Sequence, residues 1–146
     1  MDLTAIREGL ATAVDAVPSL QVFAYPPDQV PVGNTPVAVI TPGSGMYVDY
    51  NQAFNKGLGT VMFTVVLYVQ YVAPKYAFAA LEAFCSSGTG ETNSIIDTVM
   101  DGDRTLGGVC SDLVFDRVSN IIVVTNAEGV RYLSAELDVR VLAART

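Results

Sequence analysis

Hydrophobic positions recur at steps of three and four residues in three stretches of the chain, which is the spacing of one helix face. The first stretch covers residues 2–17, where Asp2 or Thr4 can cap the helix and Pro18 ends it. Its apolar face consists of Leu3, Ile6, Leu10, Ala13, Val14 and Val17. Two shorter helices are expected over residues 75–85 and 91–101.

Apolar and polar residues alternate in other stretches, which is the period of a β-strand. We expect strands over residues 20–25, 36–41, 59–72, 112–125 and 130–143. Residues 59–72 have one uniformly apolar face and one mixed face that is too apolar for bulk water. We therefore expect this strand to be covered on both sides, by a helix on one and by another element or subunit on the other.

The last two strands predict a closing hairpin around residues 126–129. The alternation is lost near residues 118–120, which indicates a β-bulge. In the final strand the positions expected to point away from the core are Ser134, Glu136, Asp138 and Arg140. The order α-β-β-β-α-α-β-β predicts a single α+β domain over residues 1–146, with a mostly antiparallel sheet covered by helices on one face.

Residues 43–58 form the least regular segment, and they are unusually rich in large apolar side chains for a loop. Two interpretations remain open. The segment is either an extended hairpin or arm that packs on a neighbouring subunit, or an ordinary hairpin whose aromatic rings lie on their own domain. Under the first interpretation, the contact residues are Met46, Tyr47, Tyr50 and Phe54.

The composition indicates that part of the surface is apolar, since the chain is 51% hydrophobic and only 16% charged. Soluble domains carry roughly 25% charged residues. A small domain has much surface to cover, so we expect some apolar surface to be buried against other chains.

Charge and residue types exclude several functions. The chain has 8 basic and 15 acidic residues and a net charge of −7, which argues against a strong nucleic-acid clamp. It contains no histidine, which excludes a Ser-His-Asp or Cys-His catalytic group and an imidazole metal ligand. Neither a signal peptide nor a membrane-spanning stretch is expected.

The remaining candidates for chemistry are weak. Residues 86–91 precede a helix and could hold an anion, but they lack the lysine of a P-loop, so Thr89 or Thr92 is expected as a cap. Asp97, Asp101 and Asp103 lack the spacing of a calcium loop, and Arg104 is expected to pair with one of them.

Three further sets of residues are assigned no chemistry. Asp112 and Asp116 would lie roughly 13 Å apart along a strand, too far for a catalytic carboxylate pair. Cys85 and Cys110 are expected to be reduced and buried, with a single disulfide as the alternative. The tyrosines are expected to pack in the core or at an interface. We therefore expect no catalytic residues, no metal and no cofactor, and no enzymatic activity.

The chain as a whole resembles the tail-terminator (tail-completion) proteins of long-tailed phages, especially those of actinobacterial hosts. The resemblance covers nearly all of the sequence and depends on the order of several short motifs. These are the helix opening at residues 2–10, Val22 to Asp28, Thr35 to Ile40, the helix that leads into Ser86 to Gly90 and Ser94 to Ile96, and Asp103 to Val109 with the closing hairpin.

The resemblance implies an α+β sandwich-like domain shared with tube and neck proteins. It implies a structural virion protein that forms a hexameric ring on the tail tube, stops its polymerisation and joins the tail to the neck of the head. The partners would be further copies of this chain, the major tail tube protein and a neck or head-completion protein. Assembly would occur in the host cytoplasm, and DNA would pass through the ring without sequence-specific binding.

The composition agrees with such a ring, because a head-to-tail ring buries two different patches on each subunit. A net charge of −7 also suits a lumen that repels passing DNA. Two alternatives stay open, another neck or tail-tube protein, and a small α+β oligomeric binding module unrelated to phages.

Overall fold

A computed structural model describes residues 1–28, 35–43, 45, 47–50, 57–90 and 92–144. The helices are α1 (Leu3–Asp15), α2 (Pro74–Cys85) and α3 (Ile95–Met100). The strands are β1 (Gln21–Phe23), β2 (Val37–Pro42), β3 (Val48–Asp49), β4 (Leu58–Gln70), β5 (Asp112–Thr125) and β6 (Arg131–Ala144). No described helix is both long and apolar enough to cross a membrane.

The strands form one mixed, six-stranded sheet in the order β1-β2-β4-β6-β5, with β3 paired to β4. Only β1 and β2 run parallel; all other pairs are antiparallel. The fold is thus a single α+β domain, as the sequence predicts, but it has one strand more. The added strand β3 continues the line of β2 along the same edge of β4, where Pro42 pairs with Phe63 and Val48 with Val61.

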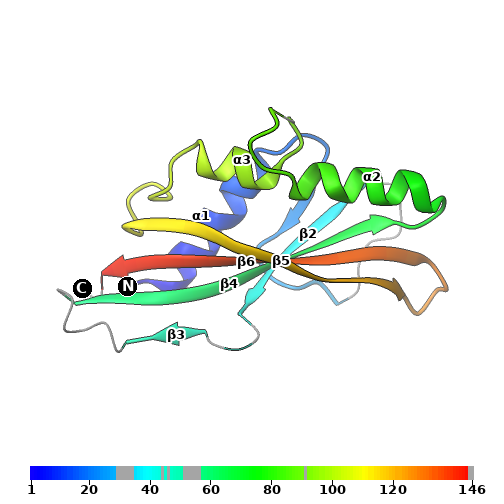
Figure 1. Ribbon diagram of the computed structural model, residues 1–146. Helices are drawn as coiled ribbons and strands as arrows, with labels where there is room; N and C mark the ends of the chain where they lie inside the picture. The colour runs from blue at the N-terminus through cyan, green and yellow to red at the C-terminus, as the bar shows by residue number, and fades with distance from the viewer. Residues whose placement is uncertain (29–34, 44, 46, 51–56, 91, 145–146) are drawn as a thin grey trace.

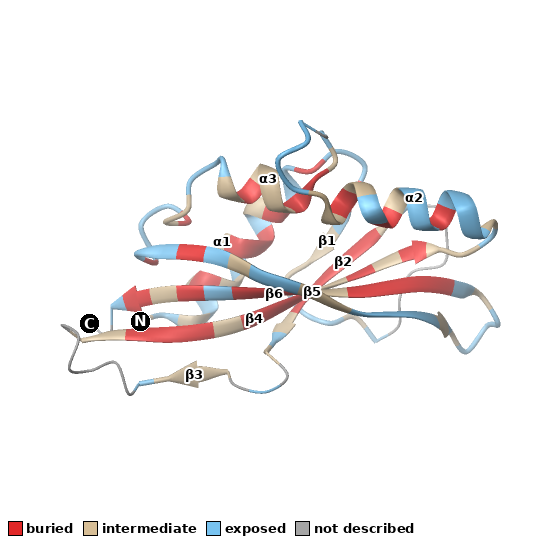
Figure 2. Ribbon diagram, viewed as in Figure 1, coloured by how far each residue is buried: buried red, intermediate tan, exposed pale blue. Residues whose placement is uncertain are grey.

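The three helices lie over one face of the sheet (Figure 1). The hydrophobic core fills the space between them and the central strands, whose inward residues are buried (Figure 2). In β4 these inward residues are Val61, Phe63, Val65, Leu67 and Val69, and in β6 they are Leu133, Ala135, Leu137, Val139, Val141 and Ala143. The period of two found in the sequence therefore correctly gives the core face of both strands.

The position of α1 and its buried face agree with the sequence prediction. Asp2 caps it, since its side chain accepts a hydrogen bond from the Ala5 amide at 3.0 Å. The helix ends at Asp15, slightly before the expected position, because the amide of Val17 turns back to the Val14 carbonyl.

The third helix is shorter than predicted and has a different cap. It begins at Ile95, four residues later than expected. The Ser94 hydroxyl caps it by accepting a hydrogen bond from the Asp97 amide at 3.1 Å. The expectation of Thr89 or Thr92 as cap is therefore wrong. The apolar spacing that marked this helix comes from Ile95 and Val99, which are buried.

The bulge expected in the closing hairpin is confirmed, and a second one is present. The register of β5 against β6 shifts between Phe115 and Arg117 and again between Ser119 and Ile122. Asn120 lies in the second shift with a φ of +53°, a conformation that asparagine tolerates better than most residues.

The sequence predicts that another element or a subunit covers the sheet face turned away from the helices. No described helix lies on it (Figure 1). Some of its central residues are nevertheless buried, among them Thr64, Ser134 and Asp138. Ser134 and Asp138 thus point away from the helices as predicted, but neighbouring side chains of the sheet shield them from solvent.

Candidate interaction surfaces

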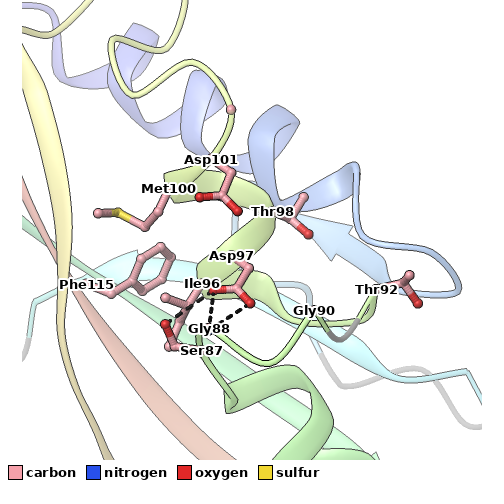
Figure 3. Close-up of a pocket in the computed structure, with 11 residues that line it drawn as sticks. Ser87, Gly88, Gly90, Thr92, Ile96, Asp97, Thr98, Met100, Asp101 and Phe115 are labelled. Carbon is pink, nitrogen blue, oxygen red and sulfur yellow. Dashed lines mark hydrogen bonds between the residues drawn. The ribbon is translucent and has the colours of Figure 1, made fainter.

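The loop before α3 surrounds a carboxylate of its own chain. The Gly88 amide donates to both oxygens of Asp97, at 2.9 and 3.0 Å, and Ser87 Oγ donates to Oδ1 at 3.3 Å (Figure 3). Ser94 Oγ donates to the Ser86 carbonyl. The amide that could have held a foreign anion is therefore occupied by Asp97, which agrees with helix entry as the role of this loop.

The acidic residues that follow α3 do not converge. Asp103 accepts hydrogen bonds from the amides of Thr105 and Gly107, both at 2.9 Å, and the side-chain bond from Thr105 is the main cause that lowers the pKa of Asp103. The described residues contain no group of three His, Cys, Asp or Glu side chains arranged for a metal ion. The cluster is therefore a set of separate turn and helix-end contacts.

The ion pairs around β5 differ from those expected. Arg104 pairs with Asp112 at 2.8 Å and not with one of the three aspartates near α3, so that prediction is wrong. Asp116 pairs with Arg140 at 3.0 Å. Asp112 and Asp116 thus each neutralise a different arginine, and they do not form a carboxylate pair.

Both cysteines are free, as expected, but Cys85 is only half-buried, so the expectation that both are buried is wrong for Cys85. Cys110 is buried and donates its thiol to the Arg104 carbonyl, with an Sγ to oxygen distance of 3.4 Å. Burial is the main cause that raises the pKa of Cys85 and of Cys110 to about 11. At neutral pH both side chains are therefore thiols and poor nucleophiles.

The four residues predicted as subunit contacts fall into three groups. Met46 and Phe54 lie outside the described residues. Tyr47 packs edge-on against Phe63 at a centroid distance of 5.5 Å, so its ring belongs to the core of its own domain. Tyr50 follows β3 and is 53% exposed. Of the two predicted contact residues that the structure describes, Tyr50 is the one with the exposure that an intermolecular anchor needs.

The structure reveals a second apolar surface, which the sequence analysis missed. Ile121, Ile122 and Val123 are 51%, 55% and 41% exposed. They lie in β5, which is an edge strand of the sheet. We call these three residues the β5 patch. The available signal was the consecutive apolar run itself, which does not follow the period of two.

The β5 patch and β3 lie at opposite ends of the sheet. Ile122 pairs with Ser134 near the end of β4, whereas β3 pairs with the start of β4 at Thr60 and Val61. A strand of 13 residues such as β4 is about 40 Å long. Figure 1 shows the end of β6 on the same side of the molecule as β3, with the β5–β6 turn at the far end.

A groove opens between α3 and β5. Its volume is about 970 Å³, and Ile96, Met100 and Phe115 form its apolar wall. Asp97 and Asp101 line the same groove from α3 and the residue that follows it (Figure 3). Among the described residues that line it, the titratable side chains are thus both carboxylates.

The sequence matches no protein-family model and no curated protein.

Proposed function

We propose that this chain is a structural virion protein of a long-tailed phage, which forms a ring on the end of the tail tube. In this role it stops tube polymerisation and joins the tail to the neck of the head, and it has no catalytic activity. The resemblance of the sequence to tail-terminator proteins supports the proposal. The structural observation that carries it is the presence of two different exposed surfaces at opposite ends of one sheet.

A head-to-tail ring needs two surfaces that differ, because each subunit uses one patch to bind the next subunit and another to bind the previous one. The β5 patch and Tyr50, which follows β3, meet this condition, since they lie at opposite ends of the sheet. We propose that the β5 patch of one copy contacts the β3–β4 end of the next.

The ion pairs of β5 lie at residues 112–117, before the β5 patch, and each is balanced within one copy of the chain. Arg104, Arg117 and Arg140 are each paired with an aspartate of the same chain. Copies that each carry a net charge of −7 repel one another over their whole surface, so a contact between them is favoured where local charges are balanced.

The test is a tail-tube assembly reaction. Tail-tube protein from the same genome is polymerised with and without this chain, and tube ends are viewed by negative-stain electron microscopy. We expect capped tubes that no longer lengthen. Tubes of unchanged length with bare ends, at every ratio of the two proteins, would contradict the proposal.

The same reaction separates the alternatives. Incorporation of this chain along the whole tube would identify a tube protein, whereas binding to heads but not to tubes would identify a neck protein. A ring that binds neither would favour an oligomeric binding module unrelated to phages.

A further inference from the structure

We propose that the groove between α3 and β5 binds an extended peptide segment of another protein, one that presents apolar side chains next to a lysine or arginine. This inference does not depend on ring formation. It follows from three features of the groove: its apolar wall, its charge and the strand edge beside it.

The apolar wall consists of Ile96 and Met100 from α3 and Phe115 from β5. All three side chains pack against the core yet stay partly exposed. A groove of about 970 Å³ is large enough for several side chains of a bound peptide. Burial of apolar side chains against this wall would supply much of the binding free energy.

The charge of the groove identifies the occupant. Asp97 and Asp101 are four residues apart, so their side chains lie on the same side of α3, where like charges repel. Asp97 is already bonded to Gly88, but the Asp101 side chain is on an exposed residue. A cation placed between the two carboxylates would relieve their repulsion, and an acidic peptide would increase it.

The strand edge gives the geometry of binding. Among the described strands, β5 pairs with β6 alone. The start of its other edge cannot pair with a further strand, because the backbone groups of Leu113 are already bonded. Arg104 donates to the Leu113 carbonyl at 3.1 Å, and the Leu113 amide donates to the Asp112 carboxylate at 2.9 Å. A peptide could therefore add as a strand from Phe115 onward, with alternate side chains directed into the groove.

A second copy of this chain, which has a net charge of −7, is a poor source of the cation. Of the six basic residues in the described ranges, Lys75 lies in helix α2 and not in an extended segment, and the other five are engaged within the chain. Arg104, Arg117 and Arg140 are in ion pairs, Arg7 donates to two carbonyls, and Arg131 lies over the Tyr71 ring. We therefore commit to a segment of a different protein.

The test uses the whole ¹⁵N-labelled protein and short capped peptides. One peptide alternates lysine and valine, a second has glutamate in place of lysine, and a third is the lysine peptide with one central amide N-methylated. We expect the lysine peptide to cause saturable amide shifts in residues 87–90, 96–102 and 115–119. The glutamate peptide should cause none, and N-methylation should weaken binding.

The matched variants are Asp101→Asn in the groove and Asp28→Asn in the exposed loop that follows β1, the opposite edge strand of the sheet. Each removes one negative charge, and the amide spectrum reports whether each is folded. Asp101→Asn should weaken binding of the lysine peptide about 2- to 5-fold, as loss of an exposed ion pair does, and Asp28→Asn should leave it unchanged.

Three results would overturn the inference. If the lysine and glutamate peptides bound equally well, charge would not determine the occupant. If the N-methylated peptide bound as well as its parent, the peptide would not add to β5 as a strand. Shifts of the same groove amides when the protein alone is concentrated would make a second copy the occupant.

Discussion

Arg117 of β5 and Asp138 of β6 face each other across the two strands, with Arg117 Nε donating to Asp138 Oδ2 at 2.7 Å. Thr64 of β4 donates to the other oxygen of the same carboxylate at 3.1 Å. Three adjacent strands are thus joined through one buried aspartate on the sheet face without helices. The carboxylate of Asp138 is the main cause that raises the pKa of Arg117.

Asp138→Ala should lower the free energy of unfolding by about 1–3 kcal/mol, because it leaves the buried Thr64 hydroxyl without its acceptor. Arg117→Ala should cost less than Asp138→Ala, since the arginine side chain is 72% exposed and water screens the pair. Urea unfolding followed by circular dichroism measures both. An equal or larger loss for Arg117→Ala would show that the arginine, and not the shared carboxylate, is the main contributor.

Arg7 connects α1 to two separate segments of chain. Its Nη1 donates to the carbonyls of Ala24 and Ile40, at 3.0 and 3.3 Å, and its guanidinium lies 4.9 Å from the Tyr25 ring centroid. Lysine has no planar fork with which to keep these contacts. Arg7→Lys should therefore lower the free energy of unfolding by about 1–2 kcal/mol in urea titrations. Lys75→Arg, on the exposed start of α2, is the control and should change it little.

The cysteines should react slowly while the protein is folded. With pKa values of about 11, raised mainly by burial, only about 1% of each thiol is ionised near pH 9. Alkylation by iodoacetamide near that pH should be slower by a factor on the order of 10 or more than in urea, where a free cysteine has a pKa near 8.5. Equal rates in both conditions would contradict the burial of these thiols.

The raised pKa values of Cys85 and Cys110 also determine how the free energy of unfolding changes with pH. A thiol whose pKa is higher in the folded state favours folding fully below the pKa of the unfolded chain, near 8.5. This contribution is lost as the pH rises from there through about 11. The unfolding free energy of the double variant Cys85→Ser, Cys110→Ser should therefore fall less over this alkaline range than that of the parent chain.

Substitution of Tyr47 should affect the stability of the fold, whereas substitution of Tyr50 should affect association between copies. Tyr47→Ala removes an edge contact with the buried Phe63 and should lower the free energy of unfolding by about 1–3 kcal/mol. Tyr50→Ala should change stability little, because the residue is 53% exposed, but it should weaken association between copies. Urea unfolding and light scattering on the two variants measure the two effects. An unchanged assembly in Tyr50→Ala would remove this residue from the proposed contact.

Much of the fold could be predicted from periodicity, because burial on one face imposes a regular spacing. The first helix, the inward faces of β4 and β6 and the bulge in β5 follow from it. The strand β3 was missed because two residues give no measurable period. The start of α3 was misplaced because Thr89, Thr92 and Ser94 are all good caps, and only tertiary contacts select Ser94.

The contact surfaces were harder to predict than the core. Tyr47 has the residue type of an interface anchor, yet it packs on Phe63, and only the three-dimensional path of the chain shows this. Arg104 could pair with any nearby aspartate, and the turn at residues 103–108 directs it to Asp112. The β5 patch depends on which strand lies at the sheet edge, a property of topology that local sequence does not encode.

The most direct test of the central claim is the mass and symmetry of the assembly formed by this chain, measured alone and on tail tubes by light scattering and electron microscopy. We predict a closed head-to-tail ring, hexameric on the tube, that Ile122→Lys weakens about 30-fold or more and that Ala79→Lys, on the exposed side of α2, leaves intact. A strict monomer in both settings, or a two-fold dimer insensitive to Ile122→Lys, would contradict it.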